Sequence, residues 1–386
     1  MSQRARVVLH ARVLWRPLTG VGHYASQLLR ALAELAPPDL EVRAFPGPAR
    51  GRERALAPVS RAPAPFRRRW PATERTRDVA RRLLEPPYEA LYRWRTRGFD
   101  LYHEPNHVPV ATRVPTVTTV HDVSVLTHPE WHPAHRVHWY ERHFERGRRQ
   151  TCRFLAVSEF TKRELVERLG VPADRIDVTL QAARPGFVPR PPEASERQAV
   201  ALEIPARFFL FVGTLEPRKN LAMLADAHAR LPAELRRRHP LVLAGARGWD
   251  DEALRERLRL RQDAGEVRVL GYVDDETLAG LYGRCTALVW PSLYEGFGLP
   301  PLEAMACGAA TITSNAASLP EVVGEGGVLL DPHDLPGWTD AMRRMAEDAA
   351  WREQWRHLGP RQAARFSWRR CAEQTAAAYR RALGRA

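Results

Sequence analysis

Residues 286–308 read TALVWPSLYEGFGLPPLEAMACG, a pattern from which the secondary structure of this region can be inferred. An apolar run is followed by a loop with two glycines, and two prolines then precede a second apolar segment. Pro300 and Pro301 suit the first turn of a helix, where a missing N–H costs nothing, and Gly308 suits its end. The stretch therefore predicts a strand, a loop and a helix in succession.

The same alternation continues through the rest of the chain. Residues 6–11 and 115–122 are strand-like, and residues 22–35 have the apolar spacing of three and four that indicates a helix. Residues 186–200 are rich in Pro, Glu and Ala and predict a linker. With 386 residues, the chain is too long for one ordinary core. We predict an α/β protein with two Rossmann-like domains, each a doubly wound parallel sheet, facing a cleft.

The chain is strongly basic, with a net charge of +14 and a pI of about 10.4. Of its 59 basic residues only Lys162 and Lys219 are lysines, which indicates an arginine-biased composition. Such a balance favours anionic partners. The four cysteines are far apart and form no C-x-x-C, no window has the apolar length of a membrane span, and the N-terminus lacks signal-peptide features. We expect a cytoplasmic protein.

Polar residues gather where the predicted strands end. Arg218 and Lys219 follow the strand near residues 208–213, and His121 ends the strand of residues 115–122. In open α/β sheets, ligands bind beyond the carboxyl ends of the strands. These residues are therefore candidates for a ligand site.

The opening stretch supplies two carboxylates. Glu295 falls in the loop and Glu303 in the first helical turn, so they do not share one helix face. A glycine loop before a helix start presents free N–H groups to an anion, and the carboxylates can accept hydrogen bonds from sugar hydroxyls. Two alternatives remain. Glu303 could merely complement the helix dipole while Glu295 is solvated, or the pair could serve a glycosidase, which fits the phosphate-type features poorly.

Glu295 and Glu303 also fit the E-x7-E signature, and the chain resembles glycosyltransferase family 4, whose members are retaining enzymes of the GT-B fold. Further segments carry this resemblance in the family's order: TGVGHYASQLL (19–29), VHDVSVLTHPEWHP (120–133), VSEFTKREL (157–165), FVGTLEPRKNL (211–221), SLPEVVGEGGVLLDP (318–332) and FSWRRCAEQTAAAYR (366–380). The subgroup that it most resembles contains mannosyltransferases and related enzymes of bacterial surface-polysaccharide assembly.

The resemblance implies an organisation and an activity. Residues 1–188 would form an acceptor-side domain, residues 200–365 a nucleotide-sugar-binding domain, and residues 366–386 a helix that crosses back to the first domain. The enzyme would move a hexose, with mannose favoured, from a nucleotide sugar, with GDP-mannose favoured, to a glycan or lipid-linked acceptor. The anomeric configuration would be retained. No metal and no other cofactor is expected, and the protein could lie peripherally on the inner face of the cytoplasmic membrane.

The resemblance also assigns roles to residues. Arg218 and Lys219 would hold the donor pyrophosphate, Glu295 the donor-sugar hydroxyls and Glu303 the ribose hydroxyls. His121 would lie beside the reacting sugar. The rest of the donor-binding set would be Gly20, Gly22, Gly296, Phe297 and Gly298.

Two other types of site fit the sequence less well. Gly20, Gly22 and Ala25 match a dinucleotide G-x-G-x-x-A fingerprint, but the fingerprint should follow its strand immediately and here it does not. Eight of the 14 histidines lie between His103 and His143, yet they show neither H-E-x-x-H nor paired cysteines. We therefore expect neither a nicotinamide enzyme nor a zinc site.

Residues 50–97 carry 14 arginines against five acids, interleaved with aromatic residues. Three interpretations stay open: a solvated face that follows the composition bias, a surface for anionic lipid or a lipid-linked acceptor, or a nucleic-acid interface. No recognised nucleic-acid fold supports the last, so we expect no nucleic-acid partner. A non-catalytic GT-B protein that binds sugar or lipid is the alternative to an enzyme, and the intact Arg218, Lys219, Glu295 and Glu303 argue against it.

One segment departs from the family's pattern. Where the family usually has an Asn-Gly-Val turn, this chain has TLQAARPGF (179–187). The change alters a loop near the expected hinge between the domains, and it leaves the expected donor site intact.

Overall fold

The structure is a computed structural model, and it describes residues 4–15, 18, 20–46, 87–190, 204–246, 248 and 252–385. Most of the predicted linker at residues 186–200 and most of the arginine-rich segment at residues 50–97 lie outside these described residues.

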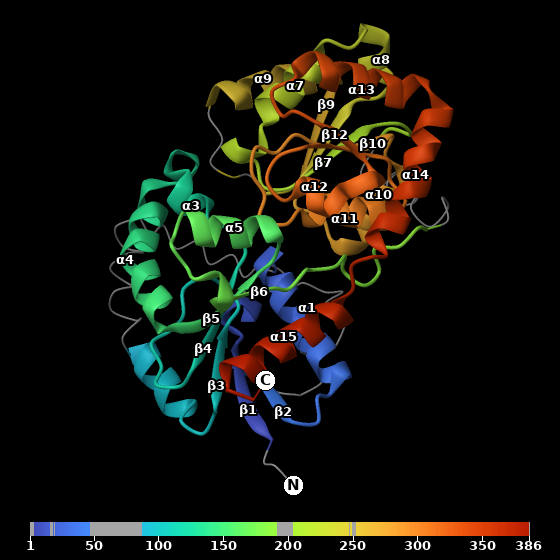
Figure 1. Cartoon of the computed structure of the whole chain (residues 1–386). Helices are drawn as coiled ribbons and strands as arrows, with labels where there is room; N and C mark the ends of the chain where they lie inside the picture. Colours follow the sequence, from blue (N-terminus) through green and yellow to red (C-terminus); the bar gives the residue numbers. More distant parts are fainter. Residues whose placement is uncertain are drawn as a thin grey trace.

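The chain forms two six-stranded sheets, one above the other in Figure 1. Every strand pairing in both sheets is parallel. The first sheet has the order β2-β1-β3-β4-β5-β6. Its strands are β1 (Ala5–His10), β2 (Leu40–Phe45), β3 (Leu101–Glu104), β4 (Thr116–Val120), β5 (Thr151–Ala156) and β6 (Ile176–Val178).

The second sheet has the order β12-β11-β10-β7-β8-β9. Its strands are β7 (Phe209–Val212), β8 (Leu241–Ala244), β9 (Val267–Gly271), β10 (Ala287–Trp290), β11 (Thr311–Ser314) and β12 (Val328–Leu330). The predicted α/β fold with two parallel, doubly wound sheets is confirmed.

Helices connect the strands and cover the sheets. Those of the first part are α1 (Gly20–Leu35), α3 (Ser124–Thr127), α4 (Ala134–Gln150) and α5 (Glu159–Glu167), and residues 87–95 are also helical. Those that follow are α7 (Leu221–Ala229), α8 (Ala233–Arg238), α9 (Glu252–Asp263), α10 (Asp275–Arg284), α11 (Leu299–Ala306), α12 (Leu319–Val323), α13 (Leu335–Glu347), α14 (Ala349–Ala363) and α15 (Trp368–Ala382).

Alternation along β1 shows how the first sheet is buried on both faces. Val7 and Leu9 belong to the core that α1 and α15 cover, whereas Val8 belongs to a second cluster with Tyr92 and Tyr102. Successive side chains of a strand point to opposite faces, so a strand covered on both sides is apolar at most of its positions, as Val7, Val8 and Leu9 are in β1. The continuous apolar runs of the sequence have this cause.

The last helix, α15, lies against α1 and the first sheet (Figure 1). Ser367 caps its start, because the Ser367 hydroxyl accepts the N–H of Arg370 at 3.2 Å. Cys371 and Tyr379 are buried on its inner face, and the Tyr379 hydroxyl lies 2.7 Å from Nδ1 of His103. The helix α15 therefore packs on the first sheet, although it follows the second sheet in the sequence.

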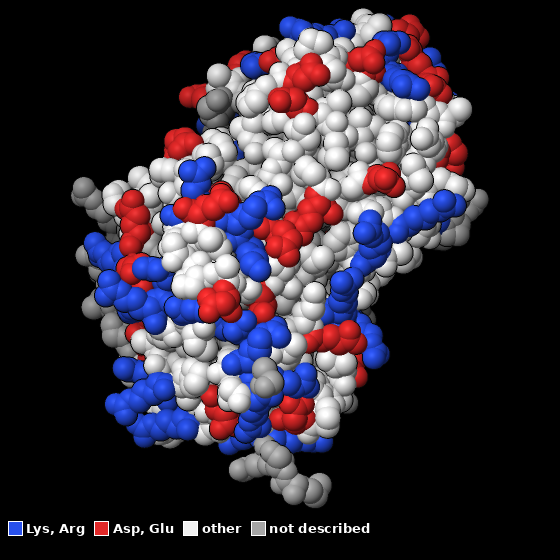
Figure 2. All heavy atoms as spheres, viewed as in Figure 1, with Lys and Arg blue, Asp and Glu red and all other residues white. Residues whose placement is uncertain are grey.

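Charge is spread unevenly over the surface. Figure 2 shows Lys and Arg side chains gathered on the part of the first domain formed by α4 and the helix of residues 87–95. Leu91 and Trp94 of that helix are 51% and 57% exposed. In the described part of the chain, no helix combines the length and the apolar character needed to cross a membrane.

The strand order of the second sheet marks a place for a ligand. From β7 the chain continues outward through β8 and β9, and it then returns to β10 and continues to the other side. The carboxyl ends of β7 and β10 are therefore neighbours at the point where the order reverses. Open α/β sheets bind ligands at such a point.

Candidate active site

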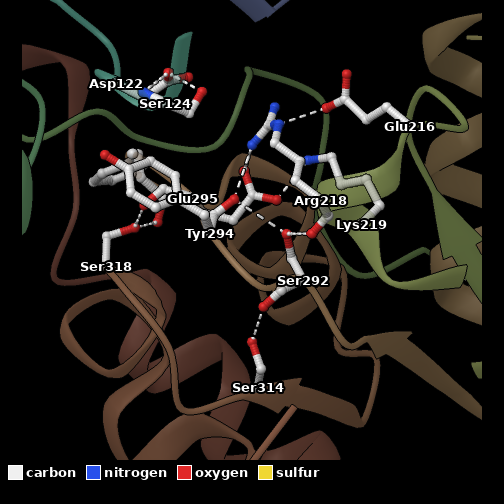
Figure 3. Close-up of polar contacts among 12 residues, drawn as sticks. Asp122, Ser124, Glu216, Arg218, Lys219, Ser292, Tyr294, Glu295, Ser314 and Ser318 are labelled. Atoms are coloured by element: carbon white, nitrogen blue, oxygen red, sulfur yellow. Dashed lines mark hydrogen bonds and ion pairs between the residues drawn. The ribbon is translucent and has the colours of Figure 1, made fainter. Parts of the chain in front are cut away.

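Two cations and a carboxylate meet at this reversal point. Arg218 and Lys219 lie in a 3-10 turn (Pro217–Lys219) after β7, and Glu295 follows β10. Lys219 Nζ lies 2.5 Å from Oε1 of Glu295, and Arg218 Nη1 lies 3.1 Å from Oε2. Figure 3 shows the three side chains pointing toward one another. The structure thus brings together three residues that the sequence analysis selected from segments far apart.

The group is buried, which strengthens its electrostatics. Lys219 and Glu295 are 6% and 7% exposed, and Lys219 Nζ lies 4.5 Å from the ring centroid of Trp290. Burial and the adjacent Arg218 lower the pKa of Lys219. Burial alone would raise the pKa of Glu295, but Lys219 and Arg218 outweigh it and hold that pKa below its usual value. Charges fixed in a buried site act more strongly than charges in water.

A second carboxylate holds Arg218 from the other side. Arg218 Nε lies 2.6 Å from Oε1 of Glu216, and Arg218 Nη1 donates to the carbonyl oxygen of Tyr294 at 2.9 Å. The guanidinium is therefore fixed in place by both strand-end loops, as a preorganised cation must be.

Buried serines fix the loop that carries Glu295 (Figure 3). The hydroxyl of Ser292 donates to the carbonyl oxygens of Arg218 and Tyr294, and that of Ser314 donates to the carbonyl oxygen of Ser292. The hydroxyl of Ser318 lies 2.9 Å and 2.8 Å from the carbonyl oxygens of Glu295 and Phe297. These serines could not be predicted from the sequence, because a lone serine has no spacing that marks its partner.

Gly296 packs against the first domain. A Cβ at this position would lie 1.6 Å from the carbonyl oxygen of His121. The Gly296 carbonyl oxygen accepts the hydroxyls of Ser158 at 2.6 Å and Thr161 at 3.1 Å. The absence of a side chain here lets the two domains touch, a reason that the sequence analysis did not give.

The next residues begin α11. Phe297 is buried against Phe366 and Leu302, and Gly298 has a φ of 108°, a conformation that favours glycine. The predicted helix is confirmed and starts at Leu299. The prediction that Glu303 lies in the first turn is wrong, because the helix begins ahead of the two prolines and Glu303 falls just beyond that turn.

Glu303 is 3% exposed and pairs with Arg184. Arg184 Nε lies 2.6 Å from Oε1 and Nη2 lies 2.9 Å from Oε2, so the pair is bidentate. Arg184 Nη1 also lies 2.5 Å from Oδ1 of Asp275 and 3.2 Å from Nε2 of His23. Arg184 was not among the predicted site residues, although it lies in the segment of residues 179–187 that departs from the family's pattern.

His121 lies at the carboxyl end of β4, on the first-domain side of Gly296. Its Nε2 lies 2.8 Å from the carbonyl oxygen of Pro105, and its ring meets that of Tyr24 edge-on at 4.9 Å. Burial lowers the pKa of His121. The imidazole is therefore neutral at pH 7, with Nε2 donating to Pro105.

Asp122 adds a carboxylate that the sequence analysis did not select as a site residue (Figure 3). Its Oδ1 accepts the N–H and the hydroxyl of Ser124, at 3.0 Å and 2.7 Å. Burial would raise the pKa of Asp122, but the positive charge of Arg218 is the largest opposing influence, and the pKa lies well below its usual value. An ionised carboxylate of the first domain thus interacts electrostatically with Arg218 of the second.

Gly20 and Gly22 lie in the first turn of α1, which also carries His23. A Cβ on Gly20 would meet nothing within 4 Å, whereas one on Gly22 would lie 2.9 Å from the side chain of Leu18. Through His23 and Arg184, this turn lies beside Glu303.

Among the clustered histidines, the ring centroids of His107 and His121 lie 5.5 Å apart, whereas others have separate partners. His128 stacks on Trp131, and His138 and His143 bond to carbonyl oxygens of their own helix. Within the described ranges, no three His, Cys, Asp or Glu side chains lie together as a metal site.

Two family models match the chain. Residues 18–179 match the family model "Glycosyltransferase Family 4", and residues 193–362 match "Glycosyl transferases group 1". "O-antigen chain mannosyltransferase B" of Escherichia coli is 36% identical over 386 residues, which is 97% of this chain and 99% of that protein. "Serotype-specific mannosyltransferase WbdA" of Escherichia coli is 38% identical over 203 residues, which cover 51% of this chain and 25% of that protein.

Solved structures show the same fold. Anabaena Alr3699/HepE, crystallised with UDP and glucose, has a TM-score of 0.69 at 18% identity and covers 97% of this chain and 99% of its own. WaaG, described as a glycosyltransferase involved in lipopolysaccharide biosynthesis, has a TM-score of 0.68 at 17% identity, with 96% and 98% covered. The two-domain GT-B architecture is confirmed.

Proposed function

The chain belongs to the GT-B glycosyltransferases of family 4, and we propose that it transfers mannose from GDP-mannose to a glycan or lipid-linked acceptor in surface-polysaccharide synthesis. The observation that carries the proposal is the buried group of Arg218, Lys219 and Glu295 at the reversal point of the second sheet. Similarity to O-antigen chain mannosyltransferase B over nearly the whole of both chains supports mannose as the sugar. Residues 200–365 would bind the donor and residues 1–188 the acceptor.

Arg218 and Lys219 suit the stabilisation of a leaving nucleoside diphosphate. Negative charge develops on a phosphate oxygen as the bond to the sugar breaks, and cations already in place need no reorganisation at that moment. Glu216 and Glu295 hold them, so their position does not depend on the substrate. Loss of one such contact typically costs about 10²–10³-fold in rate.

We propose that the reaction retains the anomeric configuration. The acceptor oxygen would bond to the anomeric carbon on the face from which the phosphate leaves, and the acceptor proton would pass to the departing phosphate oxygen. Asp122 would stay ionised and stabilise positive charge on the sugar, because a carboxylate with a lowered pKa is a weak proton acceptor. Proton NMR of the product tests this mechanism, since a product of inverted configuration would refute it.

Calorimetric titration with GDP-, UDP-, ADP- and TDP-sugars tests the donor. We expect GDP-mannose to bind most tightly and the variant Lys219→Ala to lose that affinity. Lys162→Ala is a matched control, because Lys162 is the only other lysine of the chain. Preferential binding of another sugar nucleotide would refute the mannose assignment, and no binding by any donor would favour the non-catalytic alternative.

We propose that the basic part of the first domain binds anionic lipid and brings the enzyme to a lipid-linked acceptor. On the helix of residues 87–95, the exposed Leu91 and Trp94 lie among arginines, with the side chain of Arg95 over the ring of Trp94. Apolar and aromatic groups flanked by arginine suit a membrane interface. This arrangement supports a peripheral location on the cytoplasmic membrane.

A further inference from the structure

Arg184 is an unusual residue to find at the carboxylate expected to bind ribose. It lies after β6, in the altered segment of residues 179–187, and reaches three different helices. It pairs with Glu303 of α11 and Asp275 of α10 in the second domain and with His23 of α1 in the first. One guanidinium therefore joins both domains at the candidate donor site.

The carboxylate of Glu303 has little capacity left for another ligand. Both oxygens accept guanidinium N–H groups of Arg184. The side chains of Glu303 and Arg184 are only 4% and 10% exposed. A ribose cannot reach Glu303 while the guanidinium stays where it is.

The guanidinium and a ribose compete for the same chemistry. A guanidinium presents two parallel N–H donors to the two oxygens of a carboxylate. The neighbouring 2′- and 3′-hydroxyls of a ribose present two O–H donors in a similar way. The fork of Arg184 thus takes the place that the diol of a nucleotide would need.

The side chain can leave while its backbone stays. The Ala183 carbonyl oxygen accepts the indole N–H of Trp368 at 2.9 Å, and Phe187 is buried in the second core. These contacts anchor the segment on both sides of Arg184. Asp275 is 45% exposed, so it offers the guanidinium a partner nearer to solvent.

We propose that Arg184 occupies the ribose-binding carboxylate of Glu303 and that a nucleotide must displace it in order to bind. The inference rests on the proposed donor site and adds a residue that sets the affinity of that site. A contact that stabilises the nucleotide-free arrangement weakens nucleotide binding by the same free energy. Arg184 therefore makes the protein more stable and its hold on the nucleotide weaker.

The test is the affinity for GDP and UDP in the variant Arg184→Gln, measured by calorimetry beside its melting temperature. We expect a lower melting temperature and nucleotide binding that is on the order of tenfold tighter. A merely structural role would lower the melting temperature and weaken binding or leave it unchanged, which would overturn the proposal. Arg184→Lys keeps the charge but cannot form the bidentate pair, so it should tighten binding to a smaller extent.

Two further variants separate this proposal from the site on which it rests. Glu303→Gln should weaken nucleotide binding, and in the double variant the gain from Arg184→Gln should disappear. If Glu303→Gln weakens binding but Arg184→Gln does not tighten it, only the displacement proposal falls. If Glu303→Gln leaves nucleotide affinity unchanged, both the assignment of Glu303 to the ribose and the displacement proposal are refuted. Arg236→Gln is the control, because Arg236 pairs with Glu266 away from the site, and its loss should leave nucleotide affinity unchanged.

Discussion

The variant Gly296→Ala tests whether the contact between the two domains is needed for turnover. The new Cβ would lie 1.6 Å from the carbonyl oxygen of His121, whereas an ordinary contact needs at least 3.4 Å. The domains must therefore separate by about 1.8 Å at this point, the difference between 3.4 and 1.6 Å. The obstacle is backbone, so no side chain can rotate away. The φ of Gly296 lies outside the left-handed region, and the backbone itself accepts alanine.

This separation would act on turnover and spare nucleotide binding. It would pull the Gly296 carbonyl oxygen away from the hydroxyls of Ser158 and Thr161. It would also move Arg218 and Lys219 away from His121 and Asp122. A misplacement of about 1 Å can cost about 10²-fold in rate, so we expect kcat to fall at least that far. Because Arg218, Lys219, Glu295 and Glu303 all belong to the second domain, the Kd for GDP should rise by no more than about threefold, which is under ~1 kcal/mol.

Initial rates at saturating donor, GDP calorimetry and small-angle scattering measure these three effects. The control is Gly283→Ala in α10, where a Cβ would meet nothing within 4 Å. Alanine in a helix is favoured over glycine by about 0.5–1 kcal/mol, so the control should be at least as stable and fully active. A Gly296→Ala enzyme that keeps more than half of the wild-type kcat, with unchanged scattering, would show that the domain contact is not needed for turnover.

Three further predictions concern the first domain. Asp122→Asn should lower kcat by on the order of 10²-fold and leave GDP affinity unchanged, because it removes the negative charge that interacts with Arg218. Initial rates and calorimetry measure the two effects. An unchanged kcat would refute this role. Burial lowers the pKa of His103 and of His107 to about 3, so both are neutral when folded and protonate first in the unfolded chain. Their contribution to the free energy of unfolding is fully present above pH 6.5 and is lost as the pH falls toward 3. At pH 5 the loss is up to about 2 kcal/mol for each histidine. A melting temperature that stays constant from pH 7 to pH 5 would contradict this. Binding to anionic vesicles should weaken as salt is added. It should also weaken after neutralisation of residues 67–69, which lie outside the described residues, or after Trp94→Ser. Equal binding to neutral vesicles would exclude a charge-based membrane interface.

Much of the fold could be predicted because its signals are local. Strands that are buried on both faces give continuous apolar runs, and helices give spacings of three and four, so the alternation could be read from short windows. Proline and glycine marked the ends of α11, with the two prolines in its first turn as predicted, although Glu303 lies just beyond that turn. The position of Arg218, Lys219 and Glu295 at neighbouring strand ends followed from a rule about parallel sheets.

The residues that were missed depend on contacts between distant segments. Ser314 and Ser318 act through backbone carbonyls of a loop, and Arg184 acts through an acid more than a hundred positions away. Asp122 stays ionised because of Arg218, which belongs to the other domain. No local pattern encodes such pairs, because residues that interact through space can have any separation along the sequence.

The contacts between the domains suggest how donor binding and closure are linked. Gly296 meets Ser158 and Thr161 at the start of α5, and the Glu321 carboxylate accepts the Glu159 N–H at 3.0 Å at the same helix end. These contacts hold the domains together and do not involve Arg218 or Lys219. Arg184, by contrast, joins the domains through Glu303 itself, the carboxylate that we propose binds the ribose. Displacement of Arg184 would therefore loosen one interdomain tie while the α5 contacts keep the cleft closed, so that donor exchange does not require the domains to separate fully.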